Sequence, residues 1–410
     1  MTRAGIWRAL TPTEKVYADK EIHVGYTVRT AGRLDQGALR AAYAAVCRAH
    51  PQLAARLDTR DGEVLVVESD DSPEVQFHEG DPDRPMTGVR LDQHRGLSAV
   101  NVVRDGDRAS VTLVTHHSVA DADHSLHVLA ALWSCYTDAV NGVPVELPRH
   151  PYPRPLEDLL AERGIHSPAP APAAVPAQRK PELVVLVRHM AQLRLTAAET
   201  TALVEFSRRN DVTLNGLLSG AILLVEAELR ELPVTDLALR FTVNLRNRLT
   251  PPVGATEGAN VVGGGRFTVP PGTEPDAVAI GRVVGEQLRA GLADGSMQRS
   301  LLDMVDLVNR LSSGPWQHQP PPGPAPAVIS LTNWGPIPPL RSPDGVELTN
   351  FHSCSHIREA PAAFEAARGY VASTFNGRLG IDLAFPEKDA AQVERLERIR
   401  ELLTRFAGQS

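Results

Sequence analysis

A proline- and alanine-rich tract near the middle of the chain constrains the fold more than any other feature. Residues 167–181 have the sequence SPAPAPAAVPAQRKP, and alternating proline and alanine favour a stiff, extended backbone that joins neither a packed helix nor a central strand. The chain of 410 residues is also longer than one compact core usually occupies. We therefore predict two lobes, at residues 1–166 and 183–410, joined by a linker at residues 167–182.

Predicted strands and helices alternate on both sides of this tract. Before it, residues 110–115 carry strand-forming side chains and run directly into a histidine pair, and residues 125–139 then place apolar side chains at helical spacing. After it, a long apolar helix begins near Thr213, and strands follow at residues 237–243 and 328–331. This alternation predicts two α/β lobes. The order strand, polar turn, helix displays side chains at the carboxyl end of the strand, where open α/β sheets bind ligands.

The composition argues against several classes of protein. The net charge is −7, whereas proteins that bind nucleic acids usually carry a basic patch, so we expect no nucleic-acid partner. The three cysteines, Cys47, Cys135 and Cys354, are far apart and lack a CxxC spacing, which argues against a disulfide framework or a cysteine zinc site. The first residues lack the apolar core of a signal peptide, and no apolar run is long enough to span a bilayer. We therefore expect a cytoplasmic protein without a membrane partner.

The polar side chains that could carry chemistry follow the strand predicted at residues 110–115, in the sequence HHSVADADHS. Neutral imidazole titrates at about pH 6.5, so one histidine could act as a general base toward a hydroxyl. Alternatively, the turn could hold a metal ion, or its histidines could have only the structural role of forming hydrogen bonds with other polar groups of the turn. The metal ligands would come from His116, His117, Asp121, His124 and His127. Adjacent strand residues point to opposite faces, so His116 and His117 cannot easily share one ion, and one of the pair should pack inward.

A family resemblance favours the first of these alternatives. The run HHSVAD at residues 116–121 is similar to the HHxxxD signature of the condensation-domain superfamily. That superfamily includes chloramphenicol-acetyltransferase-like folds, peptide-synthetase condensation domains and the polyketide-associated acyltransferases of mycobacteria. Upstream, residues 34–57 with the sequence His50-Pro51-Gln52-Leu53 resemble the first helix of the family and the HPxLxxRL segment after it, at the usual distance from the histidines.

The resemblance continues beyond the predicted linker, so that it covers nearly the whole chain in the correct order. The sequence TNWG at residues 332–335 is similar to the SNxG element that family members bring toward the catalytic histidine. The second-lobe pattern of the polyketide-associated acyltransferases is matched by VNLR at residues 243–246, PPV at 251–253 and EGAN at 257–260.

The resemblance implies two chloramphenicol-acetyltransferase-like lobes with a solvent channel between them and the second histidine at its middle. It makes His117 the general base and His116 a structural residue. Asp121 is expected to form a salt bridge within the scaffold, with Arg246 as its partner. Asn333 is expected to donate a hydrogen bond near the developing oxyanion, although its residue type is equally typical of a turn.

The same resemblance implies direct acyl transfer from a thioester to a hydroxyl. The chain has no GxSxG elbow, so we expect no covalent enzyme intermediate. Coenzyme A thioesters, acetyl-CoA above all, are the expected donors and co-substrates, with no permanently bound cofactor and no metal. The acceptor is expected to be a polyketide alcohol such as a rifamycin-like ansamycin. Alternatives are a carrier-protein-dependent enzyme that forms esters or amides, and a non-catalytic docking module of the same fold; the latter typically lacks the histidine motif. We expect a monomer.

Two further features bear on this expectation. The superfamily usually has glycine after the aspartate of the motif, whereas this chain has Ala122, which suggests a slightly different turn. The glycine run at residues 263–265 could bring backbone amides near an anion, but such runs more often form a bend or bulge. The arginines that could attract a phosphate in the second lobe are Arg240, Arg246, Arg248 and Arg266.

Overall fold

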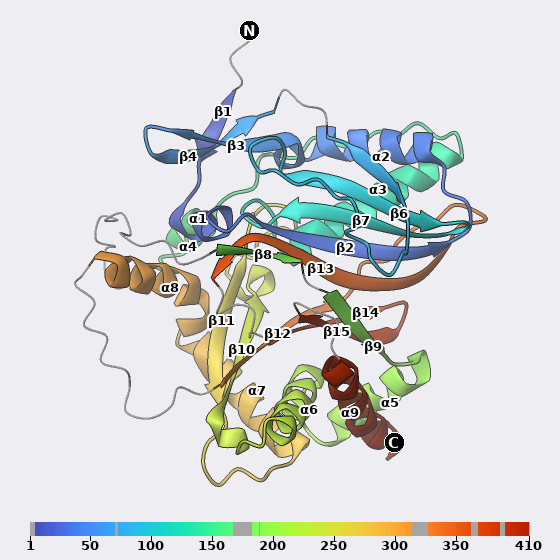
Figure 1. Cartoon of the computed structure of the whole chain (residues 1–410). Helices are drawn as coiled ribbons and strands as arrows, with labels where there is room; N and C mark the ends of the chain where they lie inside the picture. The colour runs from blue at the N-terminus through green and yellow to red at the C-terminus, as the bar shows by residue number, and fades with distance from the viewer. Residues whose placement is uncertain are drawn as a thin grey trace.

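The structure is a computed structural model that describes residues 5–69, 73–166, 183–187, 189–313, 327–361, 368–385 and 390–409. The linker predicted at residues 167–182 lies outside these residues, so the lobe boundary stays a prediction. Within the described ranges, the strands form two six-stranded sheets and one three-stranded sheet. The two large sheets occupy the upper and lower halves of the molecule in Figure 1.

The first large sheet lies beside helices α2 (Gln36–Ala49) and α3 (Ala122–Val140) and forms one core with them. The α2 helix begins directly after Asp35, whose Oδ1 accepts a hydrogen bond from Ala38 N at 2.8 Å, and it ends before Pro51. The strand order is β5 (Val75–Glu79), β6 (Ser98–Asp105), β7 (Arg108–His116), β2 (Ile22–Ala31), β13 (Glu347–Pro361) and β8 (Leu183–Val187).

The second large sheet is covered on its lower face in Figure 1 by several helices. The α6 helix is buried around most of its circumference, which explains why its sequence is apolar on all sides. These helices are α5 (Ala197–Arg209), α6 (Leu214–Leu229), α7 (Ala277–Ala293) and α9 (Ala390–Ala407). The strand order is β11 (Val262–Thr268), β10 (Leu237–Asn244), β12 (Ala327–Pro336), β14 (Arg368–Phe375), β15 (Arg378–Phe385) and β9 (His189–Arg194).

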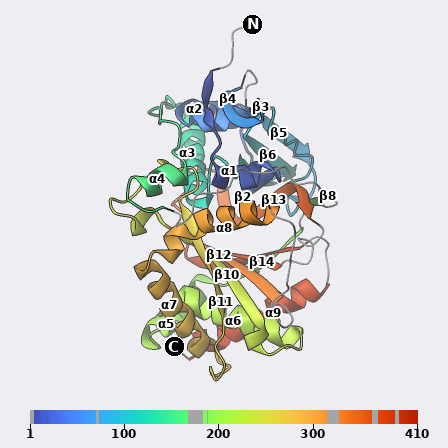
Figure 2. The same cartoon turned by 90° about the vertical axis from the view of Figure 1, so that its left-hand side faces the viewer.

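The remaining elements lie around these sheets. At the start of the α1 helix, Glu14 Oε2 accepts a hydrogen bond from Thr11 N at 3.0 Å, which is one half of a capping box. In Figure 2, α8 crosses the front of the molecule at the height between the two large sheets, and it packs on β11 and α1. The small sheet has the order β1 (Ile6–Ala9), β4 (Glu63–Glu68), β3 (Ala55–Arg60). The other helices are α1 (Pro12–Ala18), α4 (Leu156–Ala161), α8 (Ser296–Ser313) and the short 3-10 helices Pro51–Ala54, Val234–Asp236 and Arg246–Arg248.

The two large sheets do not divide strictly at the predicted linker. The β13 strand belongs to the second part of the sequence but pairs with β2 of the first part, with Phe351 opposite Val28. The end of β12 also reaches the first core, where the Trp334 ring lies 5.0 Å from the Tyr26 ring. Since β13 lies between β2 and β8, the second part of the chain completes the first sheet and ties the halves together.

The glycine run at residues 263–265 forms neither a bend nor an anion-binding loop. It lies in the middle of β11, which pairs with β10 in continuous antiparallel register. A Cβ atom on Gly263 would lie 2.1 Å from the Met297 backbone oxygen. The glycine therefore permits α8 to pack directly on the strand.

Among the described helices, none is by itself long and apolar enough to cross a membrane; α5 and α6 meet the criterion only as a pair, and they are bent by 100°.

Candidate active site

The two adjacent histidines at the end of β7 point in different directions, as expected for a strand. His116 is fully buried, and its Nδ1 lies 2.7 Å from Ser118 Oγ. Its ring meets the His23 ring edge to face at 4.7 Å. Burial, together with the neighbouring histidines, lowers the pKa of His116 well below its ordinary value. His116 is therefore a neutral residue of the protein interior.

His117 lies at a junction of three segments. Its backbone N–H donates to Ile22 O at 2.8 Å, and its ring stacks on the Tyr17 ring of α1, with 4.2 Å between centroids and 16° between planes. Its Nδ1 lies 3.1 Å from Asn260 Oδ1, and Asn260 Nδ2 donates to His117 O at 2.8 Å. No described residue forms a hydrogen bond with its other ring nitrogen.

The environment of His117 favours a neutral imidazole. Burial lowers its pKa below the ordinary value, although its own backbone carbonyl, the charge of Asp121 and the side chain of Asn260 each raise it in part. The pKa of Tyr17 is raised to about 12, mainly by burial and also by the charge of Asp121, while the charge of Arg240 lowers it in part. At neutral pH the stacked pair is thus an uncharged phenol on an uncharged imidazole, and the imidazole can accept a proton.

Asp121 is paired with Arg246 and with backbone N–H groups in the protein interior. Its Oδ2 lies 2.7 Å from Arg246 Nη1, which is the ion pair expected from the sequence, and its Oδ1 accepts from His124 N at 3.0 Å as the N-cap of α3. Burial alone would raise its pKa, but the charge and hydrogen bond of Arg246 outweigh burial and hold the pKa below the usual value. Asp121 is therefore a permanent carboxylate.

This capping contact corrects the predicted start of the following helix. The helix expected at residues 125–139 begins at Ala122, directly after the Asp121 cap. Ala122 takes helical backbone geometry and does not have a positive φ. The position that is usually glycine in the superfamily thus has no conformational requirement for glycine in this chain.

A short segment of the second part of the sequence, residues 257–261, runs along the histidine turn. Asp121 N donates to Ala259 O at 2.7 Å, and Val261 N donates to Asp121 Oδ2 at 2.8 Å. His124 Nδ1 lies 3.0 Å from Gly258 O. The turn that carries His117 is therefore fixed by residues that are far away in the sequence.

From the sequence, Asn333 is expected near His117, but the described contacts of Asn333 do not place it there. Asn333 Nδ2 donates to Asn215 Oδ1 at 3.3 Å, and its Oδ1 accepts from Gly335 N at 2.9 Å. These described contacts belong to the second part of the chain, and none joins Asn333 to His117. Its role at the oxyanion stays a prediction.

The histidines considered as metal ligands in the sequence analysis make hydrogen bonds with different residues. His124 Nε2 lies 2.7 Å from Gln52 Nε2, and the Nδ1 atom of the exposed His127 lies 2.8 Å from Asp123 O. No group of three or more histidine, cysteine or acidic side chains within the described ranges has a geometry that could hold a metal ion.

Tyr17 and Asn260 are the site residues that the sequence did not reveal. Tyr17 belongs to no recognised motif, and only its place on a capped helix could be predicted. Asn260 forms part of the matched sequence EGAN, but the match alone assigned it no role. Both reach His117 through contacts between distant segments.

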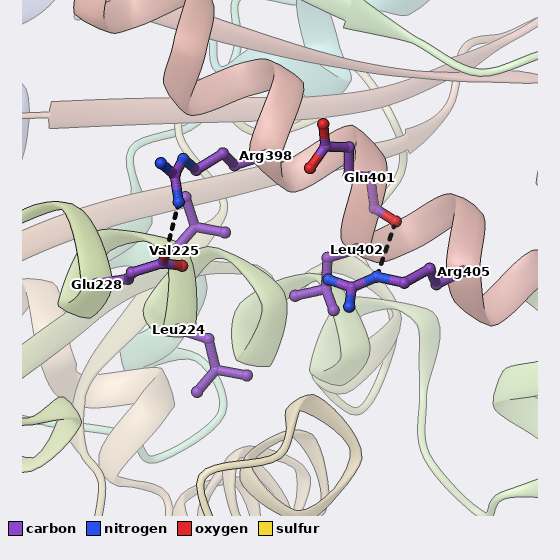
Figure 3. A pocket seen from close by; sticks show the side chains of 7 residues that line it. All are labelled: Leu224, Val225, Glu228, Arg398, Glu401, Leu402 and Arg405. Atoms are coloured by element: carbon purple, nitrogen blue, oxygen red, sulfur yellow. Dashed lines mark hydrogen bonds and ion pairs between the residues drawn. The ribbon is translucent and has the colours of Figure 1, made fainter.

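Two cavities lie away from His117. Figure 3 shows the smaller one, of about 300 Å³, between α6 and α9, where Arg398 pairs with Glu228 and Arg405 Nε donates to Glu401 O. The larger one, of about 1340 Å³, borders β5 and residues 89–96 and reaches Arg358 of β13. Neither includes His117, so the channel expected between the lobes stays a prediction.

The chain is similar to known acyltransferases in sequence and in fold. Residues 185–384 match the family described as phthiocerol/phthiodiolone dimycocerosyl transferase C-terminus. The phthiocerol/phthiodiolone dimycocerosyl transferase of Mycobacterium ulcerans (strain Agy99) is 34% identical over 405 residues, covering 93% of each chain. The corresponding transferase of Mycobacterium tuberculosis (strain H37Rv) is 30% identical over 376 residues, covering 85% of this chain and 86% of that protein.

Solved structures confirm the predicted fold class of two acyltransferase-like α/β lobes. Polyketide synthase associated protein 5 from Mycobacterium tuberculosis superposes with a TM-score of 0.80 at 27% identity, covering 99% of both chains. The first condensation domain of the CDA synthetase has a TM-score of 0.68 at 15% identity, covering 98% of this chain and 96% of that one. At this lower identity the similarity concerns the fold alone.

Proposed function

The chain belongs to the polyketide-associated acyltransferases, and we propose that it esterifies a hydroxyl of a polyketide-type product with an acyl group taken from a thioester. The observation that carries the proposal is the placement of His117. A neutral, half-buried imidazole lies at the end of β7, with Asn260 at its Nδ1 and the Tyr17 ring on its face, and its other ring nitrogen is left for a substrate. Such a group suits general base catalysis.

In the proposed reaction, His117 removes the proton of the acceptor hydroxyl as the oxygen attacks the thioester carbonyl. The new carbon–oxygen bond gives a tetrahedral oxyanion. Its collapse breaks the carbon–sulfur bond, and the leaving thiolate takes the proton back from the imidazolium, so that an ester and a free thiol result. We propose Asn333 as a donor to the oxyanion, because its amide hydrogen bond to Asn215 is long, at 3.3 Å, and can be exchanged for a stronger one.

We propose a coenzyme A thioester as the donor because of two arginines on the second sheet. Arg240 of β10 and Arg266 of β11 are direct cross-strand neighbours, both exposed, and neither forms a hydrogen bond or ion pair with another described residue. Like charges placed directly opposite destabilise a sheet unless an anion compensates them. Arg240 also acts electrostatically on Tyr17, beside His117. A phosphate of the donor would fit between these guanidinium groups.

The acceptor class rests on the relatives, whose names describe acyl transfer to phthiocerol and phthiodiolone. We propose a bulky polyketide alcohol, with ansamycins as one group to be tried. A carrier-protein thioester is the alternative donor, since its pantetheine arm also carries a phosphate. A non-catalytic docking role is disfavoured because both histidines and Asp121 are present and Asp121 is paired.

The test uses the purified full chain with acetyl-CoA and a panel of polyketide alcohols, following free thiol and ester product. His117→Ala should lower kcat by about 10²–10⁴-fold. His127→Ala is the matched control, because this exposed histidine lies on the same helix and should leave kcat unchanged, whereas a metal site would require it. Near-normal turnover by His117→Ala would sink the proposal. Thiol release without any alcohol would indicate a thioesterase instead.

A further inference from the structure

The contact between Asn260 and His117 joins residues 143 positions apart and uses both ends of the amide group. Asn260 is 1% exposed, so water does not compete for these hydrogen bonds. Asn260 lies just before β11, in the segment that also binds Asp121 and His124 through Ala259, Val261 and Gly258. The amide therefore belongs to a rigid frame rather than to a free loop.

The two distances determine which way the amide points. The backbone oxygen of His117 can only accept a hydrogen bond, so the atom 2.8 Å from it must be the amide nitrogen of Asn260. The opposite orientation would bring two oxygens together without a proton between them. The atom that faces the ring is therefore Asn260 Oδ1, which in turn can only accept.

This orientation determines the position of the imidazole proton. Because Oδ1 accepts, His117 Nδ1 must donate, and in neutral imidazole the second nitrogen is then unprotonated. We propose that Asn260 is a positioning residue that holds His117 in the Nδ1–H form and leaves Nε2 as the basic atom. This inference rests on the proposed acyl transfer, since it names the atom through which His117 acts.

The stacking contact with Tyr17 favours the same orientation of the His117 ring as the contact with Asn260. Tyr17 lies flat against one face of the imidazole, so the ring cannot rotate away from Asn260 without losing the stack. Asn260 and Tyr17 come from different parts of the sequence. The basic form of His117 thus depends on the packing of residues 257–261 against the histidine turn, and the active site is complete only when both parts are docked.

A direct test is nitrogen-15 NMR of the full chain labelled at its 14 histidines, with the His117 signals assigned by their loss in His117→Gln. At a pH where His117 is neutral, the wild-type protein should show a protonated Nδ1 and an unprotonated Nε2. In Asn260→Ala the tautomer with the proton on Nε2 should be more populated than in the wild type, because Nδ1–H has lost the Asn260 acceptor. A wild-type protein with its proton on Nε2 would overturn the proposal, even if the variant fails to fold.

Kinetics supply a second readout, with acetyl-CoA and an accepted alcohol as substrates. We expect Asn260→Ala to lower kcat by about 10- to 100-fold, the scale on which outer partners of metal-bound histidines affect activity, with a smaller change in KM. Asn260→Asp keeps an acceptor for Nδ1–H and adds a negative charge, which favours the imidazolium. The acid limb of its kcat/KM profile should therefore move to higher pH.

Asn101→Ala is the matched control. This buried amide also donates to a backbone oxygen, Pro85 O at 2.8 Å, but has no described contact with His117. Its loss should leave the tautomer and the pH profile unchanged. If His117→Ala is inactive while Asn260→Ala keeps its tautomer and its kcat, the positioning role is wrong and the acyl-transfer proposal stands. If the tautomer is as inferred but His117→Ala keeps full activity, the proposed function fails instead.

Discussion

Arg246 and Asp121 form an ion pair between the two parts of the chain, with Arg246 Nη1 2.7 Å from Asp121 Oδ2 and each side chain only 2% exposed. Arg246 Nε also lies 3.3 Å from Asp123 Oδ2 and 3.0 Å from Ala255 O, so its charge is fully compensated. The pair is adjacent to the turn that carries His117. If His117 acts as the proposed base, charge pairing and proton transfer are carried by different residues of the same turn.

Breaking this pair should be costly. Removing one partner of a buried ion pair typically costs about 3–5 kcal/mol, because the remaining charge stays buried. We expect Asp121→Asn to lower the free energy of unfolding in urea by about 3 kcal/mol, since the amide keeps one oxygen for the cap and Asp123 compensates Arg246 in part. Asp138→Asn is the control: its partner Arg341 is 55% exposed, so about 1 kcal/mol or less should be lost. Equal losses in both variants would contradict the prediction.

Activity should fall on the acid side as His117 becomes protonated. Burial lowers the pKa of His117, so the neutral base is present above that pKa and is lost as the pH falls through it. We expect the midpoint of the acid limb of kcat/KM to lie below about pH 6.5, the ordinary value for histidine. The pKa of His116 is also lowered, so that residue stays neutral in this range. An acid limb centred above neutral pH would be inconsistent with His117 as the base.

The role of Asn333 can be separated from its structural hydrogen bond. If its amide stabilises the oxyanion, Asn333→Ala should lower kcat by about 10²–10³-fold with little change in KM. Asn215→Ala removes the partner of the same amide without removing the amide itself. It should therefore leave kcat within a few fold. Similar losses of kcat in the two variants would show that the Asn215–Asn333 hydrogen bond matters for structure and that Asn333 is not an oxyanion donor.

Stability should depend on pH through Asp382, which connects β15 to β13. Its Oδ2 accepts from Ser353 N at 2.7 Å, and burial raises its pKa to about 7, although Ser353 and Gln192 lower it in part. A raised pKa means that the folded state favours the protonated acid. Its contribution to stability is complete below about pH 4, the ordinary value for Asp, and is lost as the pH rises through about 7.

Asp382→Asn tests this dependence, because the amide cannot ionise. The melting temperature of the variant relative to wild type should therefore rise between pH 5 and pH 8. A difference that stays constant over this range would show that Asp382 does not titrate there.

Two glycines in helices should respond in opposite directions to alanine. A Cβ on Gly220 of α6 would lie 2.2 Å from the Ala277 backbone oxygen at the start of α7, so Gly220→Ala should cost about 1–3 kcal/mol of unfolding free energy. A Cβ on Gly285 of α7 would meet no atom within 4 Å, so Gly285→Ala should stabilise the protein by about 0.5–1 kcal/mol. Denaturant unfolding of both variants measures the difference, and destabilisation by Gly285→Ala would count against the close-packing explanation.

Local features of the fold followed well from the sequence. The side chains of Asp35 and Thr213 cap their helices, as their residue types favour, because a cap depends on atoms within a few positions. The strand that leads to the histidine pair was also predicted, since alternation and β-branched side chains are local signals. The expectation of a bend or bulge at the glycine run, residues 263–265, was wrong, because the missing side chain of Gly263 permits a contact with α8 that no local sequence pattern shows.

The sequence by itself determined the secondary structure around the histidine turn, the fold class through its motifs, and the choice of His117 and Asp121 as the residues to examine. Only the tertiary structure decided that β13 returns to the first sheet, that residues 257–261 bind the histidine turn, and that Tyr17 and Asn260 hold the imidazole. The physical reason is distance along the chain. Periodicity and capping report interactions between near neighbours, whereas the protonation state and orientation of His117 depend on burial and on an amide 143 positions away.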